Sequence, residues 1–170
     1  MDVLIRRIVV PVDFSPASER AANYAAALAR RLGASLHLLH VVEPAALMRG
    51  PFELHEHTSP ELLDLSFRDT RVCLGALRDR LTHGPVITGE VRYGDPAEVV
   101  TAGAMDQRAD LVVMATHGRS GVSHGMGRVT ERVVRSSPAP VLVVRDCGQV
   151  QVHRASSLES MLPGPEHAVT

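Results

Sequence analysis

The chain has 170 residues, of which 45% are hydrophobic and 22% charged, and its formal net charge is −1. This length suits a single domain with a substantial core. The near-neutral charge gives no global reason to expect binding to nucleic acid or an anionic membrane, and the 3% aromatic content argues against a base-stacking surface.

The cysteine pattern and the absence of targeting signals bear on location. Cys73 and Cys147 have neither metal-ligand spacing nor a disulfide pattern, which suits a reducing compartment. The first residues lack a signal-peptide layout, and no apolar run is long enough to span a bilayer. We therefore expect a soluble, cytoplasmic protein that binds neither membrane nor nucleic acid.

The first quarter of the chain predicts a strand, a helix and a second strand. Residues 8–12 form an apolar run that should be a central strand ending at Asp13. A Ser-Pro pair then starts a helix that runs to Gly33, with Ser as N-cap and Pro in the first turn. Its many alanines allow close packing on a sheet. Residues 35–42 read as the second strand.

The middle of the chain repeats this alternation after a predicted surface loop at 43–59. Pro60 begins a helix that Gly84-Pro85 ends, and residues 86–92 form a third strand. Asp95, followed by Pro and with Glu98 placed for a capping box, starts a helix that runs to about residue 107. The expected buried stripe of the first of these helices is Leu63, Phe67, Leu74, Leu77 and Leu81.

Residues 110–145 predict a βαβ unit around a glycine-rich loop. Residues 111–114 should be a buried strand, and residues 141–144 a second one after Pro138 ends the intervening helix. Residues 146–170 show no sustained period, so we expect a domain over 1–145 and a flexible tail that is dispensable for folding. The loop glycines are Gly118, Gly121, Gly125 and Gly127, and the expected helix stripe is Met126, Val129 and Val133, with Val134 beside it.

The alternation βαβαβαβαβ predicts an α/β fold with an open, doubly wound parallel sheet. Ligands of such sheets bind at the carboxyl ends of strands where the strand order reverses. Asp13, Ser15 and the segment 115–118 should flank that crevice. The first loop lacks the dinucleotide glycine fingerprint, and no Gly-Lys-Ser/Thr follows the later glycines. A different nucleotide geometry is needed.

The chain resembles the universal stress protein family in segments distributed over residues 3–145. The resemblance implies a Rossmann-like, five-stranded parallel sheet of order 3-2-1-4-5 and a homodimer built through Val141–Val144. In one subgroup of the family it also implies bound ATP. The matching segments are Ile8-Val9-Val10-Pro11-Val12-Asp13-Phe14-Ser15, His40-Val41, Gly94-Asp95-Pro96, Met114-Ala115-Thr116-His117-Gly118-Arg119-Ser120-Gly121, Thr130-Glu131-Arg132-Val133 and Pro140-Val141-Leu142-Val143-Val144.

The subgroup's ATP motif is Gly, two residues, Gly, nine residues, Gly, then Ser or Thr. Here Ala115 replaces the first glycine, and Gly118 fits the second. Gly127 fits the third if the loop is one residue shorter, which puts Arg128 where Ser or Thr belongs. The resemblance implies ATP or ADP as ligand and leaves Mg²⁺ at the phosphates open. The predicted binding residues are Pro11, Val12, Asp13, Ser15, Val41, Ala115, His117, Gly118, Arg119, Gly121, Gly127, Arg128, Val129 and Thr130.

Several of these residues also have simpler interpretations. The glycines can provide loop flexibility alone, Asp13 can be a turn-forming carboxylate, and Arg128 can be a solvated helix residue. His117 is expected to orient the loop. Four histidines do not complete a tetrahedral metal site, and two serines lack a nucleophile-elbow sequence. These histidines are His55, His57, His117 and His124, and the serines are Ser120 and Ser123.

The sequence therefore supports three functional hypotheses. The first is a dimeric stress-response regulator that binds an adenine nucleotide and is not an enzyme. The second is a dimeric interaction module of the same family that has lost nucleotide binding, as the shortened loop and Arg128 suggest. The third is an ATP hydrolase, for which no base or metal-ligand set is visible beyond Asp13.

Overall fold

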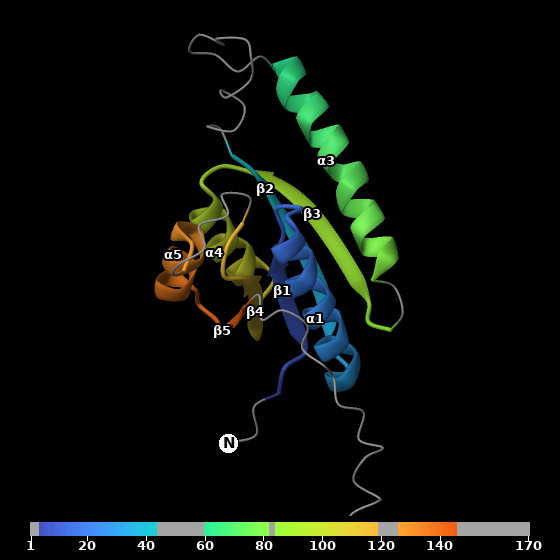
Figure 1. Cartoon of the computed structure of the whole chain (residues 1–170), viewed down its shortest axis with the longest axis vertical. Coiled ribbons are helices and arrows are strands. Elements are labelled where there is room, and N and C mark those ends of the chain that lie inside the picture. Colours follow the sequence, from blue (N-terminus) through green and yellow to red (C-terminus); the bar gives the residue numbers. More distant parts are fainter. Residues whose placement is uncertain (1–3, 44–59, 82–83, 119–125, 146–170) are drawn as a thin grey trace, which may run out of the picture.

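The computed structural model describes residues 4–43, 60–81, 84–118 and 126–145, in which strands and helices alternate (Figure 1). The strands all run parallel in one five-stranded sheet of order β3-β2-β1-β4-β5. The predicted fold and strand order are confirmed. The elements are β1 (Arg7–Pro11), α1 (Pro16–Leu32), β2 (Ser35–Val42), α3 (Pro60–Arg80), β3 (Ile87–Tyr93), α4 (Pro96–Asp106), β4 (Leu111–Ala115), α5 (Arg128–Ser136) and β5 (Val141–Val144).

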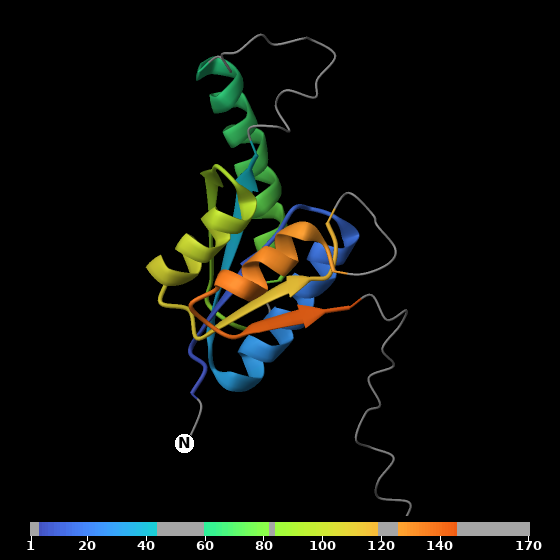
Figure 2. The ribbon, with the colours of Figure 1, turned by 90° about the vertical axis from the view of Figure 1, so that its left-hand side faces the viewer.

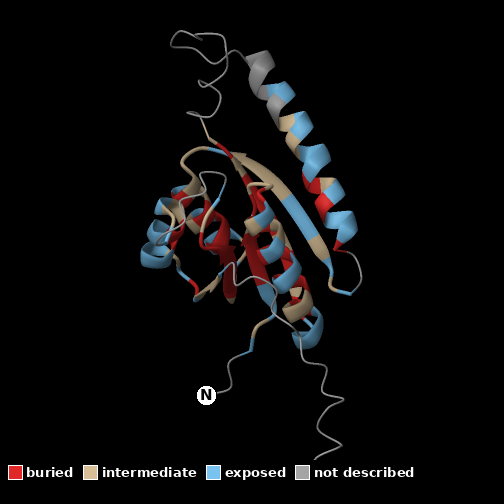
Figure 3. Ribbon diagram, in the orientation of Figure 1, coloured by how far each residue is buried: buried red, intermediate tan, exposed pale blue. Residues whose placement is uncertain are grey.

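Helices cover both faces of the sheet, α1 and α3 on one and α4 and α5 on the other (Figures 1 and 2). Alternate residues of β1 point to the two layers, so Ile8 and Val10 join the α1 side and Val9 the α4 side. These three residues are fully buried. The central strands form the buried core, and exposure increases toward the outer helices (Figure 3).

The alanine-rich face of α1 explains how closely this helix lies on the sheet. Ala22, Ala25 and Ala29 are fully buried against β1 and β4. Ser15 caps the helix by accepting a hydrogen bond from the N–H of Ser18, at 3.2 Å. The predicted N-cap is confirmed.

Two predictions for the last βαβ unit are corrected. The helix begins at Arg128, so Met126 precedes it and is exposed, and Val134 is exposed on the helix surface. The buried residues of α5 are Thr130 and Val133, which therefore mark the side of the helix that faces the sheet. The expected buried strand β5 is only half-buried throughout, since it is the last strand of the sheet.

Part of the sequence prediction falls outside the described residues. This applies to the tail 146–170, to Cys147 and to almost all of the loop predicted at 43–59. The tail and the boundary of the domain at residue 145 stay predictions. Among the described helices, none is long and apolar enough to cross a membrane.

Asp95 joins the start of α4 to α5. Its Oδ1 accepts the N–H groups of Ala97 and Glu98, both at 3.0 Å, and its Oδ2 lies 2.7 Å from Nη1 of Arg132. The Arg132 hydrogen bond is the main cause that holds the pKa of Asp95 below its ordinary value. The Glu98 carboxylate lies 3.5 Å from Nη2 of Arg132. Asp95 is therefore both a helix cap and a link between two helices.

We expect Asp95→Ala to lower the free energy of unfolding by about 1–2 kcal/mol near neutral pH, the usual cost of losing an N-cap. The lowered pKa means that ionised Asp95 stabilises the fold above its unfolded-state pKa, and that this contribution disappears as pH falls through the folded-state value. Urea unfolding of wild type and variant should thus converge in acid. Glu98→Ala, at a more exposed carboxylate, is the control and should cost only a few tenths of a kcal/mol. Equal losses for the two variants would contradict the capping role.

Candidate functional site

The carboxyl ends of β1 and β4 meet at the centre of the sheet. These strands are direct neighbours, and the chain order reverses between them, since β2 and β3 lie on one side and β5 on the other. Such a reversal is where open α/β sheets bind ligands. Asp13 follows β1 and Gly118 follows β4, so the two predicted residues lie at the same edge.

The Asp13 carboxylate is held in place by the start of α1. Its Oδ1 accepts two hydrogen bonds from Ser15, from the N–H at 3.1 Å and from the hydroxyl at 2.6 Å. The N–H of Asp13 is 3.3 Å from the Ser18 hydroxyl oxygen. Ser15 is buried and Asp13 half-buried. Ser15 therefore orients the carboxylate, and its predicted contact with a ligand stays a prediction.

Gly118 lies directly against that carboxylate. A Cβ atom at this position would stand 2.3 Å from Oδ2 of Asp13, a distance that real Cβ contacts do not reach. A side chain at 118 would therefore have to shift Oδ2 of Asp13, while Oδ1 of the same carboxylate holds the hydrogen bonds from Ser15. The neighbouring strand end thus favours glycine at this position, before any ligand is considered.

The segment at the end of β1 has a second contact that the sequence did not predict. The buried His40 donates from Nδ1 to the Val12 carbonyl at 2.7 Å, and its ring stacks on Phe14 with centroids 4.6 Å apart. Phe14 has a φ of 61°, a conformation uncommon outside glycine. The N–H of Val12 donates to the Leu39 carbonyl at 2.9 Å. His40 thus fixes the backbone next to Asp13, and its only sequence signal is the matching pair His40-Val41.

The predicted base-binding residues differ in what they can offer a ligand. Both main-chain groups of Val12 have protein partners, and its side chain is buried. Pro11 at the end of β1 and Val41 near the end of β2 are half-buried. Since Pro11 pairs with Leu39, these residues lie on adjacent strands at the same edge as Asp13. They form an apolar border beside the carboxylate.

The start of α5 lies next to the end of β4. Gly127 is the N-cap and provides no side-chain hydrogen bond to the first turn. Its N–H donates to the Thr116 carbonyl at 2.8 Å, and a Cβ there would lie 3.0 Å from that oxygen. The buried Thr130 donates its hydroxyl to the Ala115 carbonyl at 3.0 Å. These contacts bring a helix N-terminus without a side-chain cap to the edge that holds Asp13 and Gly118.

Two charged or polar groups stand beside this helix start. Arg128, the first residue of α5, is exposed and forms no ion pair with another described residue. Val129 after it packs partly against the core. His117 has a buried Nε2 atom without a hydrogen-bond partner among the described residues. Arg119 and Gly121 lie outside those residues, so their predicted roles stay predictions.

The site contains charge and hydrogen-bonding groups but no evident metal cluster. Within the described ranges, no group of three or more His, Cys, Asp or Glu residues could hold a metal ion. The arrangement offers a fixed carboxylate, a half-buried apolar border and free positive potential at the start of α5. Such a combination suits a ligand with one apolar or aromatic part and one anionic part.

Comparison with known proteins identifies the family. A family model described as "Universal stress protein family" matches residues 4–145. A universal stress protein of Thermus aquaticus is 34% identical over 144 residues, which cover 84% of this chain and 100% of the relative. The chain belongs to the universal stress protein family.

Solved structures agree with this assignment of a universal stress protein. That of MJ0577, a universal stress protein of Methanocaldococcus jannaschii, has a TM-score of 0.73 at 27% identity, with coverage of 84% of this chain and 97% of the other. A universal stress protein in complex with cAMP has a TM-score of 0.64 at 24% identity, with coverage of 83% and 97%. The second comparison supports the shared fold.

Proposed function

We propose that this universal stress protein binds an adenine nucleotide, ATP or ADP, at the carboxyl edge of its sheet and acts as a cytoplasmic homodimeric regulator. One observation carries the nucleotide part: the contact between Asp13 and Gly118 places a fixed carboxylate beside the uncapped start of α5. The carboxylate suits hydroxyl or amino donors of a nucleoside. The helix start suits phosphate.

The two ends of the proposed site have different support. At the nucleoside end, Pro11, Asp13 and Val41 match the family's base-binding positions and lie together at one edge. At the phosphate end, Arg128 replaces the family's hydroxyl residue, and the Thr130 hydroxyl bonds to Ala115. The relative with cAMP shares the fold, and its ligand is a property of that protein. The proposal therefore rests on the residues of this chain.

The proposed site fits the nucleotide without an assigned metal or catalytic group. Gly118 and Gly127 allow Asp13 and Thr116 to lie close to the main chain. We assign the phosphates to the N–H groups in the first turn of α5, which has no side-chain cap. The phosphates of bound ATP would neutralise the positive charge of Arg128 and of the N-terminus of α5. Asp13 is the described carboxylate at the site, and its Oδ1 accepts two hydrogen bonds from Ser15, so we propose binding without committed hydrolysis.

The experiment that tests nucleotide binding starts with purified protein. Denaturation and filtration should release an adenine nucleotide, and calorimetry of nucleotide-free protein should show heat with ATP and with ADP. Phosphate release under steady state should stay near the background. If nothing is released and no heat appears with millimolar ATP, the interaction-module hypothesis replaces this one. Arg128, in place of the hydroxyl residue, is the observation that favours that alternative.

Arg128 gives a prediction in which stability and binding change in opposite directions. A cation in the first turn opposes the helix dipole by about 0.3–1 kcal/mol. We expect Arg128→Ala to raise the free energy of unfolding slightly. The affinity for ATP should fall several-fold, because charge-assisted contacts to phosphate are lost, and the affinity for adenosine should be unchanged. Urea unfolding and calorimetry measure the two effects.

Arg135→Ala is the matched control on the same helix. Arg135 lies in the last turn and pairs with Glu131, so its loss should lower stability and leave ATP binding unchanged. An Arg128→Ala protein that loses stability, or that binds ATP as tightly as wild type, would contradict the assignment of Arg128 to the phosphates.

The homodimer part of the proposal is supported by the surface around β5. Tyr24 is 52% exposed on α1, on the flank opposite to Glu19, which pairs with Arg80 of α3. Val134 is 44% exposed on α5, on the flank away from Arg132 and α4. Tyr24 thus lies away from α3, and Val134 away from α4. The last strand is bordered by exposed apolar groups on each face, which suits association with a second copy.

A further inference from the structure

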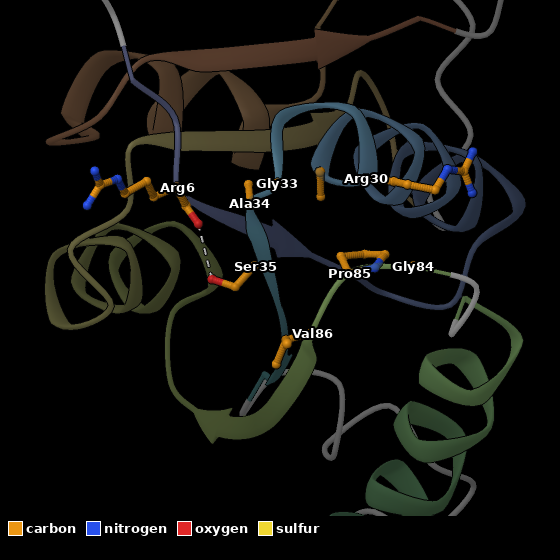
Figure 4. A pocket seen from close by; sticks show the side chains of 9 residues that line it. Arg6, Arg30, Gly33, Ala34, Ser35, Gly84, Pro85 and Val86 are labelled. Atoms are coloured by element: carbon orange, nitrogen blue, oxygen red, sulfur yellow. Dashed lines mark hydrogen bonds between the residues drawn. The ribbon is translucent and has the colours of Figure 1, made fainter.

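A second surface lies at the amino edge of the sheet, opposite to the proposed nucleotide site. A hollow of about 440 Å³ opens there, between the starts of β1, β2 and β3 (Figure 4). Figure 4 shows Arg6 and Arg30 on opposite sides of it. Aliphatic side chains form much of its wall, and these are Ala29, Ala34, Pro85 and Val86. The hollow thus combines aliphatic side chains with polar groups, and Arg6 and Arg30 extend outward on its two sides (Figure 4).

Several exposed arginines lie at the amino edge of the sheet, and Arg6 among them lines the hollow. The main chain brings them together, since the N–H of Ser35 donates to the Arg6 carbonyl at 2.8 Å and the N–H of Asp110 to the Arg7 carbonyl at 2.9 Å. Among the described residues, Arg6, Arg7, Arg31 and Arg108 form no ion pair. Several arginines elsewhere do so, as Arg68, Arg92, Arg132 and Arg135 show. This edge therefore carries unneutralised positive charge.

Asp110 is the acidic residue within this arginine group, and it is already engaged. Its Oδ2 accepts the main-chain N–H groups of Arg6 at 2.8 Å and Arg7 at 2.9 Å. One carboxylate cannot balance four arginines. The helix dipole explains a cation at Arg31 in the last turn of α1, and at Arg108 just after α4, but not at Arg6 and Arg7. Arg6, just before β1, and Arg7, its first residue, need another explanation.

Exposed apolar side chains accompany these charges. Val86 is 73% exposed at the mouth of the hollow, and Leu4 and Leu32 are exposed at the same edge. Arginine is enriched in protein–protein interfaces, and an apolar side chain in a pocket is a common anchor of such contacts. None of the described residues that line the hollow is aromatic, so they do not offer the base-stacking surface typical of single-strand nucleic-acid sites.

We propose that this amino edge is a docking surface for an acidic peptide segment of a partner protein. An aliphatic or aromatic side chain of the segment occupies the hollow between Ala29, Ala34 and Val86. Its carboxylates pair with Arg6, Arg7 and Arg31, for which the planar guanidinium group is well suited. Because the two surfaces lie at opposite edges of the sheet, peptide and nucleotide can bind to the same chain at once.

The test uses full-length protein and a fluorescent peptide in which glutamates flank a central Leu-Phe pair. Anisotropy measures its affinity for wild type, for Arg6→Ser/Arg31→Ser and for Val86→Ser. We expect the double variant to bind roughly tenfold more weakly, since each exposed charge pair contributes up to a few-fold, and Val86→Ser to bind several-fold more weakly. Arg68→Ser/Arg71→Ser removes the same charge from exposed positions on α3 and should bind like wild type.

Further probes separate this docking surface from other anion binding. A peptide with glutamine for glutamate, and one with serine for Leu-Phe, should each bind more weakly than the original. The proposal is overturned if the α3 variant loses as much affinity as the amino-edge variant, if Val86→Ser has no effect, or if an oligo-dT strand competes better than the peptide. ATP binding by Arg6→Ser/Arg31→Ser should be unchanged, so this result is independent of the proposed nucleotide site.

Discussion

Gly118→Val should abolish nucleotide binding while the protein remains folded. The Cβ of residue 118 would stand 2.3 Å from Oδ2 of Asp13, and a branched side chain adds bulk toward the space proposed for phosphate. A shift of Oδ2 would disturb the carboxylate whose Oδ1 accepts two hydrogen bonds from Ser15. We expect calorimetry to show no heat with millimolar ATP, and thermal unfolding to show a folded protein.

The ligand series distinguishes the two reasons for this loss. If the displaced Asp13 carboxylate is responsible, Gly118→Ala should lower the affinity for adenosine and for ATP alike, because the nucleoside end of the site is disturbed. If only the phosphate space is filled, adenosine should still bind to Gly118→Val. Gly75→Ala on α3 is the control, since a Cβ there meets no atom within 4 Å. Unchanged ATP affinity in Gly118→Val would place the ligand elsewhere.

The contact at Gly118 also shows what the sequence could and could not predict. The βα alternation followed from apolar runs and helix caps, because these signals depend on neighbours in the chain. Asp13 and Gly118 were placed at the same edge by the same reasoning. Their direct contact depends on the pairing of β1 with β4, which are about a hundred residues apart in sequence. A contact between residues so far apart in sequence leaves no local sequence pattern.

The features that sequence analysis missed have similar causes. Phe14 has a positive φ, which cannot be predicted from its residue type. His40 donates a hydrogen bond to Val12, which lies 28 residues earlier in the sequence. Val134 was expected beside the buried stripe because it is apolar. Its exposure follows from the orientation of α5, which Arg132 ties to α4. The periodic pattern finds a helix more reliably than it finds which apolar residues face a neighbour.

The second large effect is expected at the last strand. We expect the Val143→Lys variant to be either a monomer or an insoluble protein, and in neither case a soluble dimer. Residues 141–144 are half-buried although β5 pairs with β4 on one side only. Pairing with the same strand of a second copy would bury Val143 together with Tyr24 and Val134. A Lys side chain there would place two unpaired ammonium groups, one from each copy, in an apolar interface.

The expected size of this effect follows from the cost of an uncompensated charge. A loss of several kcal/mol in the free energy of dimerisation corresponds to a dimer dissociation constant that is at least about a hundredfold higher. Light scattering across a concentration series measures it, and urea unfolding shows whether the monomer is folded. Val72→Lys puts the same charge on the exposed surface of α3 and should leave the dimer unchanged. A Val143→Lys protein that remains a dimer at micromolar concentration would show that association uses a surface other than β5.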